Sequence, residues 1–395
     1  AGDHHSVGSP WAIGNGAGGH TAVEPALGTL ADFDRFVKAA GSLGMEVSLD
    51  FAIQCSPDHP WVKEHPEWFR HRPDGTIKYA ENPPKEYQDI YPIDFDTAAQ
   101  QDLMLALLDV VWFWVAHGVR IFRVDNPHTK PAAFWEWLIG EVQSRRPDVI
   151  FLAEAFTRPK MMKVLAKAGF SQSYTYFTWR NTKYELTEYL TELTTTSTRD
   201  YFRPNFFTNT PDILTEVLQT GGRPAFKMRL VLAATLSPGY GIYSGFELCE
   251  NQAAAPGSEE YINSEKYEIK VRDWNQPGNI KEFVARVNRI RHRNPALHKF
   301  RNLRFLPADN EQMLFYSKAA ANGSNILLIA VNLDPLHPQE CTVTVPPEVA
   351  GVAPGQRYRV TDLLTNASYE WSERNYVRLD PALQPAHILR VEPHL

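Results

Sequence analysis

Two short hydrophobic segments that each end in an acidic residue constrain the fold of this chain more than any other feature. Residues 119–125 read VRIFRVD, and residues 149–154 read VIFLAE. Runs rich in Val, Ile and Phe are typical of buried parallel strands. The segment between them, 131–147, carries apolar residues at roughly helical spacing and has a proline at each end. The sequence therefore predicts a β-α-β unit with parallel strands.

The acids that end these strands, Asp125 and Glu154, are candidate catalytic groups. In a parallel barrel or a doubly wound sheet, functional side chains lie at the carboxyl ends of the strands, so both carboxylates would face one pocket. Arg123 precedes Asp125 by two residues and lies on the same side of the strand, where a cation keeps a carboxylate ionised. The alternative is that both acids are helix caps or loop charges. A buried arginine is costly without a partner, which favours the catalytic interpretation.

Composition excludes several classes of protein. The 395 residues are 43% hydrophobic and 22% charged, which permits a large core and suggests two or three domains. A net charge of −6 argues against nucleic acid as the main partner. No apolar run approaches the ~20 residues that cross a membrane. The first residues lack the layout of a secretory signal, so we expect a cytoplasmic location. We expect no metal and no cofactor, because the cysteines are widely separated: Cys55, Cys249 and Cys341.

Strands and helices alternate along most of the chain, which favours a (β/α) barrel over an antiparallel sheet. Six barrel strands are expected, near residues 46, 119, 149, 172, 205 and 240. A closed barrel needs eight. We therefore expect a (β/α)8 TIM barrel that lacks its first two strands, in a chain that is the C-terminal part of a longer protein. The alternative is that two strands escape detection. Further expected elements are a strand at 172–177 and helices at 30–43, 212–218 and 226–236. In the C-terminal part, strands are expected at 325–333, 341–346, 358–364, 367–371, 376–380 and 387–392.

The predicted domains are a barrel over residues 1–302 and a C-terminal all-β sandwich over 303–395, where short strands occur without long helices. The barrel carries one insertion at 54–94, after its third strand, and another at 247–275, after its last. The first contains seven prolines and is too long for a plain connection, which is typical of functional lids. A glycine-rich loop, GSPWAIGNGAGG, lacks the Lys-Ser/Thr ending of a phosphate-binding loop, so we interpret it as lining a site or spanning a surface.

Four stretches together carry a family resemblance: RVDNPHTKP, AEAFTRP, AENPPKEYQDIYP and SEKYEIKVRDW. They resemble the α-amylase superfamily of retaining glycosidases and transglycosidases, and within it the maltosyltransferases. The resemblance implies transfer of a maltosyl unit from α-maltose 1-phosphate to the non-reducing end of an α-1,4-glucan, with release of phosphate. It also implies a homodimer formed through the missing N-terminal sequence.

Residue roles follow from the same resemblance. Asp125 matches the nucleophile, Glu154 the general acid/base and Asp212 the acid that stabilises the transition state. A retaining transfer needs such a carboxyl pair ~5 to 5.5 Å apart. On sequence alone Asp212 suits a helix N-terminus equally well. The resemblance implies that the other matching residues, among them Arg123, bind substrate. Four others are expected around the donor phosphate and three around the second sugar of the maltosyl unit: Asn82, Lys85, Tyr87 and Asn126; Gln54, Lys266 and Tyr267.

The chain departs from the usual α-amylase pattern at several positions. The strand that usually ends in Asn-His reads DFAIQC, with Gln54 and Cys55 in their place, and Pro211 replaces the histidine that precedes the third acid. These changes put starch hydrolysis in doubt. The alternatives left open are an α-glucan hydrolase or transglycosidase of the α-amylase type, and a non-catalytic glycan-binding or structural fragment.

Overall fold

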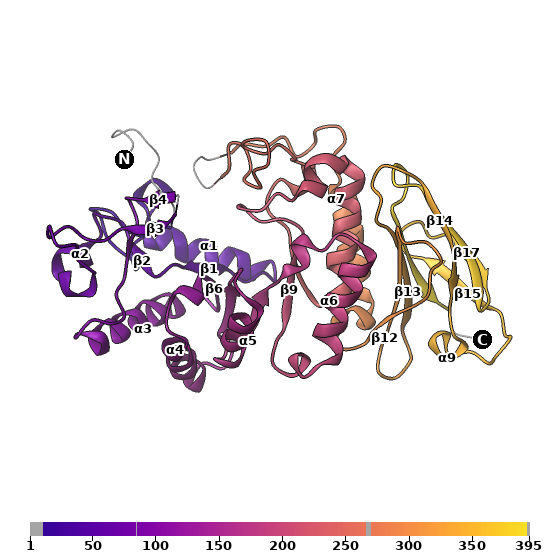
Figure 1. Cartoon of the computed structure of the whole chain (residues 1–395), viewed down its shortest axis with the longest axis horizontal. Coiled ribbons are helices and arrows are strands. Elements are labelled where there is room, and N and C mark those ends of the chain that lie inside the picture. The colour runs from indigo at the N-terminus through magenta and orange to yellow at the C-terminus, as the bar shows by residue number, and fades with distance from the viewer. Residues whose placement is uncertain (1–10, 84, 266–269, 393–395) are drawn as a thin grey trace. The chain divides into compact units, whose positions relative to one another are not determined.

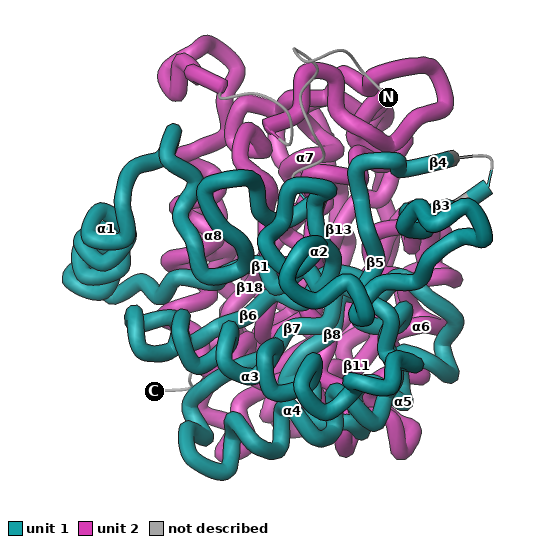
Figure 2. Tube along the Cα trace, turned by 90° about the vertical axis from the view of Figure 1, so that its left-hand side faces the viewer, with its two compact units in different colours: residues 1–174 teal, residues 175–395 magenta. Residues whose placement is uncertain are grey.

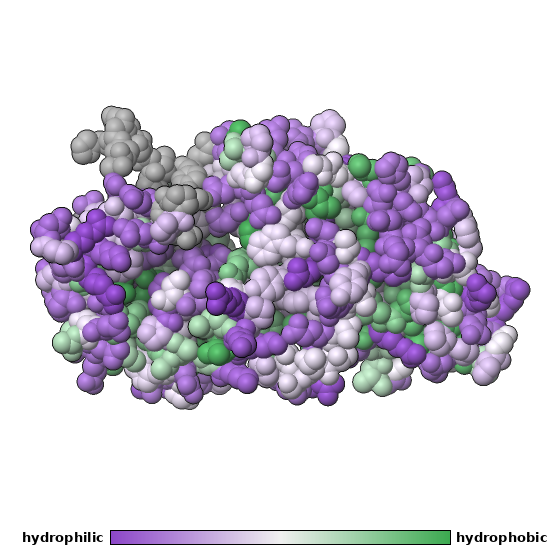
Figure 3. Space-filling model, viewed as in Figure 1, coloured by the Kyte–Doolittle hydropathy of each residue, from purple (hydrophilic) through white to green (hydrophobic). Residues whose placement is uncertain are grey.

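The computed structural model describes residues 11–83, 85–265 and 270–392 (Figure 1). The chain divides into two compact units, residues 1–174 and residues 175–395 (Figure 2). The described part contains no helix that is both long enough and apolar enough to cross a bilayer. The face drawn in Figure 3 is mainly hydrophilic, with smaller apolar areas between the polar side chains.

The first unit is built on four parallel strands in the order β1-β6-β7-β8. Their bounds are β1 (Ser48–Phe51), β6 (Ile121–Asp125), β7 (Ile150–Glu154) and β8 (Gln172–Tyr174). The register places Asp50 beside Arg123, and Asp125 beside Glu154. Because neighbouring strands share this register, the two acids that end β6 and β7 lie side by side.

Four helices accompany this sheet: α1 (Leu30–Ser42), α3 (Gln100–Ala116), α4 (Ala132–Arg145) and α5 (Pro159–Lys167). Strand side chains alternate between the two faces of the sheet. Phe122, Val124 and Phe151 are almost fully buried in the core that also contains residues of α3 and α4. The rings of Phe122 and Phe151 stack at 5.6 Å. One face of the sheet is therefore a hydrophobic core, and the alternate positions are left for polar side chains such as Arg123 and Asp125.

The insertion after β1 forms small antiparallel elements. β2 (Gln54–Cys55) pairs with β5 (Tyr91–Pro92), and β3 (Ala80–Asn82) pairs with β4 (Lys85–Tyr87). The segment between these pairs contains a short helix, α2 (Pro60–Glu64). This segment therefore has hydrogen-bonded strand pairs of its own, while the predicted bounds of the insertion, 54–94, stay a prediction.

The second unit begins with a parallel pair, β9 (Pro204–Phe207) and β10 (Gly239–Gly241). Its helices are α6 (Lys183–Thr195), α7 (Glu216–Leu236) and α8 (Lys281–Arg293). Helix α7 is interrupted by non-helical backbone at Gly222 and is almost entirely buried beyond Pro224. Within it, Arg229 is 1% exposed and donates to the carbonyl oxygens of Phe177 and Arg180. A buried guanidinium thus fixes the chain that follows β8.

Two sequence expectations in this region are wrong. The predicted strand 172–177 ends at Tyr174, because residues Tyr176–Trp179 form a 3₁₀ turn in which the Thr175 hydroxyl accepts from the Phe177 N–H. The helix predicted at 212–218 begins only at Glu216. The preceding residues form a turn closed by a backbone bridge between Thr210 and Ile213.

The C-terminal part of the second unit consists of two antiparallel sheets. The first has the order β11-β12-β13-β18-β15-β16, and the second pairs β14 with β17. Their bounds are β11 (Leu303–Phe305), β12 (Met313–Ala319), β13 (Ile326–Asn332), β14 (Gln339–Thr344), β15 (Tyr358–Asp362), β16 (Ser368–Trp371), β17 (Arg374–Leu379) and β18 (Ala386–Val391). Residues of both sheets share one core, which confirms the predicted sandwich. The predicted domain boundary at 302 stays a prediction.

Strand β12 is missing from the sequence prediction. Almost all of its residues are buried, so it has no alternating pattern. It also contains Lys318, whose ammonium donates to the Lys299 carbonyl at 2.5 Å. Burial lowers the pKa of Lys318 to about 7. A lysine in such a segment suggests a surface position, which explains the error.

Trp135 gives a direct test of the packing behind the first sheet. This fully buried residue of α4 donates from Nε1 to the Pro127 carbonyl at 2.9 Å. Trp135→Phe leaves that carbonyl without its donor, so we expect a loss of about 1 to 3 kcal/mol in the free energy of unfolding. Urea unfolding followed by far-UV circular dichroism measures it. The control Trp274→Phe changes a side chain that is 42% exposed and should have little effect. An equal loss in both variants would contradict the packing described.

Candidate active site

Asp125 lies at the carboxyl end of β6 and is 4% exposed. Two amide side chains donate to it: Gln54 from Nε2 to Oδ2 at 3.3 Å, and Asn126 from Nδ2 to Oδ1 at 3.2 Å. The Arg123 guanidinium is 3.8 Å from Oδ1. The carboxylate is therefore nearly shielded from water and oriented from several sides, which are the properties of a preorganised nucleophile.

The Arg123 side chain lies among three acids, each at or near the carboxyl end of a strand: Asp50, Asp125 and Glu154. Its guanidinium is 3.3 Å from Asp50 Oδ1, 3.8 Å from Asp125 Oδ1 and 3.5 Å from Glu154 Oε1. Its Cζ lies 5.7 Å from the centre of the Tyr174 ring. Burial alone would lower the pKa of Arg123, but the surrounding carboxylates, Glu154 first, raise it above its usual value. The arginine is thus a permanent cation between the two candidate catalytic acids.

Opposing effects set the charge state of Asp125. Burial raises its pKa above the ordinary value, while the charges of Arg123 and Lys130 act in the opposite direction. Burial also lowers the pKa of Lys130 to about 8, against the attraction of Asp125. The Lys130 ammonium donates to the Thr129 hydroxyl at 2.8 Å. The site therefore holds a carboxylate whose ionised form is less favourable than in water.

A turn directly after β6 connects the two acids. Asn126 has a φ of 43°, a left-handed conformation that asparagine tolerates better than most residues. Its backbone N–H donates to Glu154 Oε2 at 3.4 Å, while its side chain donates to Asp125. The Thr129 hydroxyl donates to the Asn126 carbonyl at 2.8 Å and stabilises the turn. One residue thus contacts both carboxylates.

The structure brings together five of the residues singled out from the sequence: Gln54, Arg123, Asn126, Asp125 and Glu154. Three further candidates lie in the β3–β4 hairpin. Asn82 and Lys85 pair through their backbones at the end of the β3–β4 hairpin, and Tyr87 is partly buried in β4. Lys266 and Tyr267 lie outside the described residues.

Asp212 belongs to the second unit, where it lies in the turn before α7. Its backbone N–H donates to the Thr210 hydroxyl at 3.2 Å, and its side chain is partly buried. The role in transition-state stabilisation stays a prediction, as do the roles of the other candidates.

Sequence reasoning missed three residues beside the acids: Asp50, Lys130 and Tyr174. Asp50 and Tyr174 lie at or near the carboxyl ends of β1 and β8, so the strand-end rule that selected Asp125 could have found them. Lys130 comes five residues after Asp125 in a turn, and sequence spacing offers no comparable signal for it.

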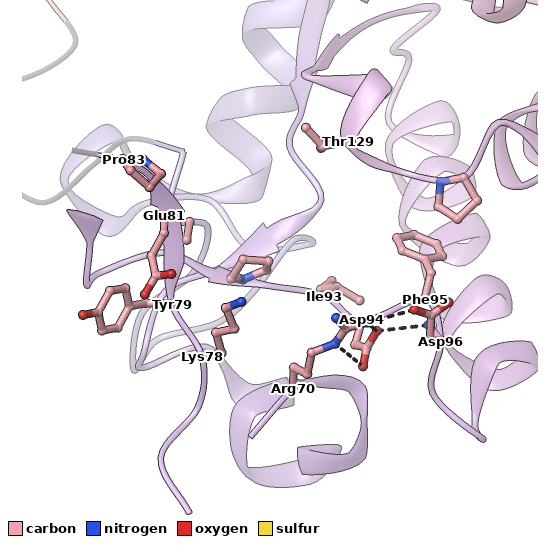
Figure 4. A pocket seen from close by; sticks show the side chains of 13 residues that line it. Arg70, Lys78, Tyr79, Glu81, Pro83, Ile93, Asp94, Phe95, Asp96 and Thr129 are labelled. Carbon is pink, nitrogen blue, oxygen red and sulfur yellow. Dashed lines mark hydrogen bonds and ion pairs between the residues drawn. The ribbon is translucent and has the colours of Figure 1, made fainter. Parts of the chain in front are cut away.

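A separate cavity of about 520 Å³ opens between the insertion and the turn after β6 (Figure 4). Arg70 crosses one side of it and is held by Asp94 and Asp96, while Thr129 lies on the opposite wall. Asp125 and Glu154 are not among the described residues that line it. The cavity is therefore a neighbour of the acids and not their pocket.

Known proteins resemble this chain in both sequence and structure. A family model described as "GLGE, C-terminal" matches residues 305–391. The α-1,4-glucan:maltose-1-phosphate maltosyltransferase of Rhodospirillum rubrum is 61% identical over 98% of this chain and 56% of its own length. Maltosyltransferase 1 of Streptomyces coelicolor is 59% identical over 98% of this chain and 57% of its own length. The chain thus spans little more than half the length of these relatives.

Two solved structures share the fold. An α-amylase from Geobacillus thermoleovorans, complexed with acarbose, gives a TM-score of 0.74 at 17% identity, covering 96% of this chain and 84% of that one. The maltogenic α-amylase AmyB from Thermotoga neapolitana gives 0.73 at 18% identity, covering 100% and 88%. The fold is therefore that of the α-amylases, a TIM barrel followed by a β domain. By sequence, the chain is a homologue of the α-1,4-glucan:maltose-1-phosphate maltosyltransferases over nearly its whole length, which confirms the predicted resemblance.

The raised pKa of Asp125 predicts a stability change with a definite sign. A carboxyl whose pKa is raised by folding destabilises the folded state once it ionises, so Asp125 costs stability at pH 7, and this cost disappears below the pKa of the unfolded state. Asp125→Asn should therefore increase the free energy of unfolding at pH 7 by about 0.5 to 2 kcal/mol. The gain should shrink as the pH falls toward 4, where the wild-type carboxyl becomes protonated. Thermal unfolding at several pH values measures this change.

Asp148→Asn is a control, because folding lowers the pKa of Asp148 whereas it raises the pKa of Asp125. The side-chain hydrogen bond from Arg146 lowers the pKa of Asp148, so its ionised form is favourable in the folded state. This variant should show no gain at pH 7. A gain for Asp125→Asn that grows on acidification would contradict the electrostatics described.

Proposed function

We propose that this chain carries the catalytic acids of a retaining maltosyltransferase, which moves a maltosyl unit from α-maltose 1-phosphate to the non-reducing end of an α-1,4-glucan and releases phosphate. The observation that supports the proposal most directly is the position of Asp125 beside Glu154, at the ends of adjacent parallel strands, with Arg123 between them. The names of the relatives support the choice of donor and acceptor.

Strand spacing favours a retaining mechanism. Neighbouring strands lie about 4.8 Å apart, and Asp125 and Glu154 are direct partners in the β6–β7 register. A retaining pair needs carboxyl groups about 5 to 5.5 Å apart, whereas an inverting pair needs about 6.5 to 9.5 Å to admit a water molecule. Side chains on adjacent, paired positions suit the shorter separation.

In the first step of the proposed reaction, the Asp125 carboxylate attacks the anomeric carbon of the maltosyl unit. The bond from that carbon to the phosphate oxygen breaks, Glu154 gives a proton to the departing oxygen, and phosphate leaves. In the second step, the 4-hydroxyl of the glucan's terminal glucose attacks the same carbon and gives its proton to Glu154. Asp125 is then released as a carboxylate. Two inversions at one carbon retain the α configuration.

Other residues take supporting roles in this proposal. Arg123 opposes the effect of burial on the pKa of Asp125 and so favours the carboxylate form that attacks, and Asp212 stabilises the oxocarbenium-like transition state. Asn82, Lys85, Tyr87 and Asn126 bind the donor phosphate, and Gln54, Lys266 and Tyr267 hold the second sugar. The proposal further includes a homodimer and a cytoplasmic location, both of which rest on the family resemblance.

Product analysis tests the proposed reaction. The purified protein is incubated with α-maltose 1-phosphate and maltohexaose, and products are followed by mass spectrometry together with released phosphate. We expect glucans that grow in steps of two glucose units, with one phosphate for each step. Free maltose as the main product would favour the hydrolase alternative, and an absence of both products would favour a non-catalytic fragment.

Lys85→Ala tests whether the leaving group is phosphate. Hydrogen bonds to charged groups contribute about 1.5 to 3 kcal/mol, so the variant should slow transfer from maltose 1-phosphate by roughly one to two decades. Transfer from maltosyl fluoride, which has no phosphate, should barely change. Comparison of kcat/KM for the two donors measures the effect, and Lys63→Ala, on the exposed face of α2, is a matched control. Equal losses with both donors would show that Lys85 supports the fold or the sugar.

A further inference from the structure

Two buried histidines lie beside the segment that carries Gln54. His20 is 9% exposed and His59 is 1% exposed, although 39 residues separate them. His20 Nδ1 lies 2.9 Å from His59 Nε2, and the His20 ring stacks on Trp61 at 5.0 Å. This histidine pair has no part in the reaction derived above.

The surrounding hydrogen bonds determine where each proton lies. The backbone N–H of Trp61 donates to His59 Nδ1 at 3.0 Å, so that nitrogen must be an acceptor. The proton of neutral His59 is then on Nε2, where it is donated to His20 Nδ1. The proton of neutral His20 must therefore be on Nε2, which donates to the Ala52 carbonyl at 2.8 Å. All four ring nitrogens have a partner of the correct kind.

This arrangement argues against a metal site. Cys55 is buried beside the two histidines, and one ligand atom of each residue lies within 4.8 Å of the others. Binding a metal through His59 Nε2 would need a lone pair there, so the ring proton would move to Nδ1. That proton would then face the Trp61 N–H, placing two donors against each other. Burial also lowers the pKa of His20 to about 4 and of His59 to about 3, which keeps both rings neutral.

The histidine pair explains the glycine-rich loop. A Cβ added at Gly14 would lie 2.6 Å from the His59 ring, and one added at Gly19 would lie 2.5 Å from His59 Nε2. Contacts that short do not occur between real side chains, so the loop must be glycine where it crosses the ring. Gly14 also has a φ of 88°, which favours glycine. The described part of the loop, residues 11–19, thus covers the His59 ring closely.

The glycine-rich loop and His20, the residue that follows it, are attached to the two ends of the segment that carries Gln54. His20 bonds to Ala52 on one side, and on the other side the Ser56 N–H donates to the Ile13 carbonyl at 2.8 Å. Gln54 lies between these attachments and donates to Asp125 Oδ2. A change in the histidine pair would therefore move the amide that orients the candidate nucleophile.

We propose that His20 and His59 form a neutral, metal-free positioning pair that holds Gln54 against Asp125. The catalytic consequence rests on the proposed function of Asp125, whereas the pair and its effect on Gln54 can be measured without any turnover.

The first test measures the proton positions and the metal content. In the protein labelled with ¹⁵N-histidine, long-range ¹H–¹⁵N spectra at pH 5.5 should show both residues neutral, with the proton on Nε2. The exposed His71 provides the comparison signal in the same spectra. A proton on Nδ1 of His59, or one equivalent of zinc in the purified protein by mass spectrometry, would overturn the proposal.

The second test measures the coupling to Gln54. The side-chain amide resonance of Gln54, assigned with Gln54→Ala, should shift in Asp125→Asn and also in His59→Ala, but not in the control His71→Ala. His59→Gln retains a donor and an acceptor and should restore most of the wild-type position. It also serves if His59→Ala fails to fold. An unchanged Gln54 resonance in folded His59→Ala, or a large displacement of that resonance in His59→Gln, would overturn the positioning role.

A double-mutant cycle extends the test to catalysis. With maltosyl fluoride as donor, His59→Ala should lower kcat about tenfold, the effect of one lost buried hydrogen bond. In a Gln54→Ala background the same change should cost less than about twofold, because the residue it positions is already gone. If His59→Ala lowered kcat by the same factor with and without Gln54→Ala, the positioning role would be overturned. If the wild-type protein transfers no maltosyl unit, the proposed function fails while the resonance measurements still decide the inference.

Discussion

The guanidinium of Arg123 is the interaction on which the rest of the site depends. Without it, Asp125 and Glu154 would be two carboxylates side by side at buried or partly buried positions, and their mutual repulsion would favour protonation of one. Arg123 neutralises part of this charge from the same face of the sheet. Even so, burial keeps the pKa of Asp125 above its ordinary value. The site thus retains an electrostatic cost, which is common where a reactive group is held ready for use.

The register of the parallel sheet places the charged side chains that interact with Arg123 next to one another. Register places Asp50 beside Arg123 and Asp125 beside Glu154, so an alternation of two residues along β6 is enough to align the charges. Behind the sheet, Phe122, Val124 and Phe151 occupy the opposite positions and fix the strands in the core. Trp135 then holds the turn after β6 through the Pro127 carbonyl. Packing on one face thereby determines the geometry of the acids on the other.

Much of this arrangement could be predicted from the sequence, because the strongest signals are local. The segments that became β6 and β7 are hydrophobic runs ending in acids, and their order along the chain implies parallel pairing. The helix expected at residues 30–43 is found at Leu30–Ser42, where Thr29 and Asp32 form a capping box. The resemblance to α-amylases added the identities of the substrate-binding candidates, which spacing alone does not provide.

The errors come from residues whose environment is set by distant parts of the chain. Phe177 reads as part of a strand, but a cap by Thr175 and the buried Arg229 of α7 place it in a 3₁₀ turn. Lys318 reads as a surface residue, yet it lies in the buried strand β12. The His20–His59 pair joins positions 39 residues apart, so no local pattern indicates it.

The central claim is that Asp125 attacks the sugar, and covalent trapping tests it most directly. The donor 2-deoxy-2-fluoro-α-maltosyl fluoride transfers its sugar to the nucleophile of a retaining enzyme, and the anomeric fluoride departs. The fluorine at carbon 2 destabilises the oxocarbenium-like transition state of both steps, so the covalent fluoromaltosyl enzyme is released slowly. Peptide mapping of the protein after incubation should show one fluoromaltosyl group, attached to Asp125. An adduct on Glu154 or Asp212, or no adduct in a protein that turns over the unfluorinated donor, would contradict this account.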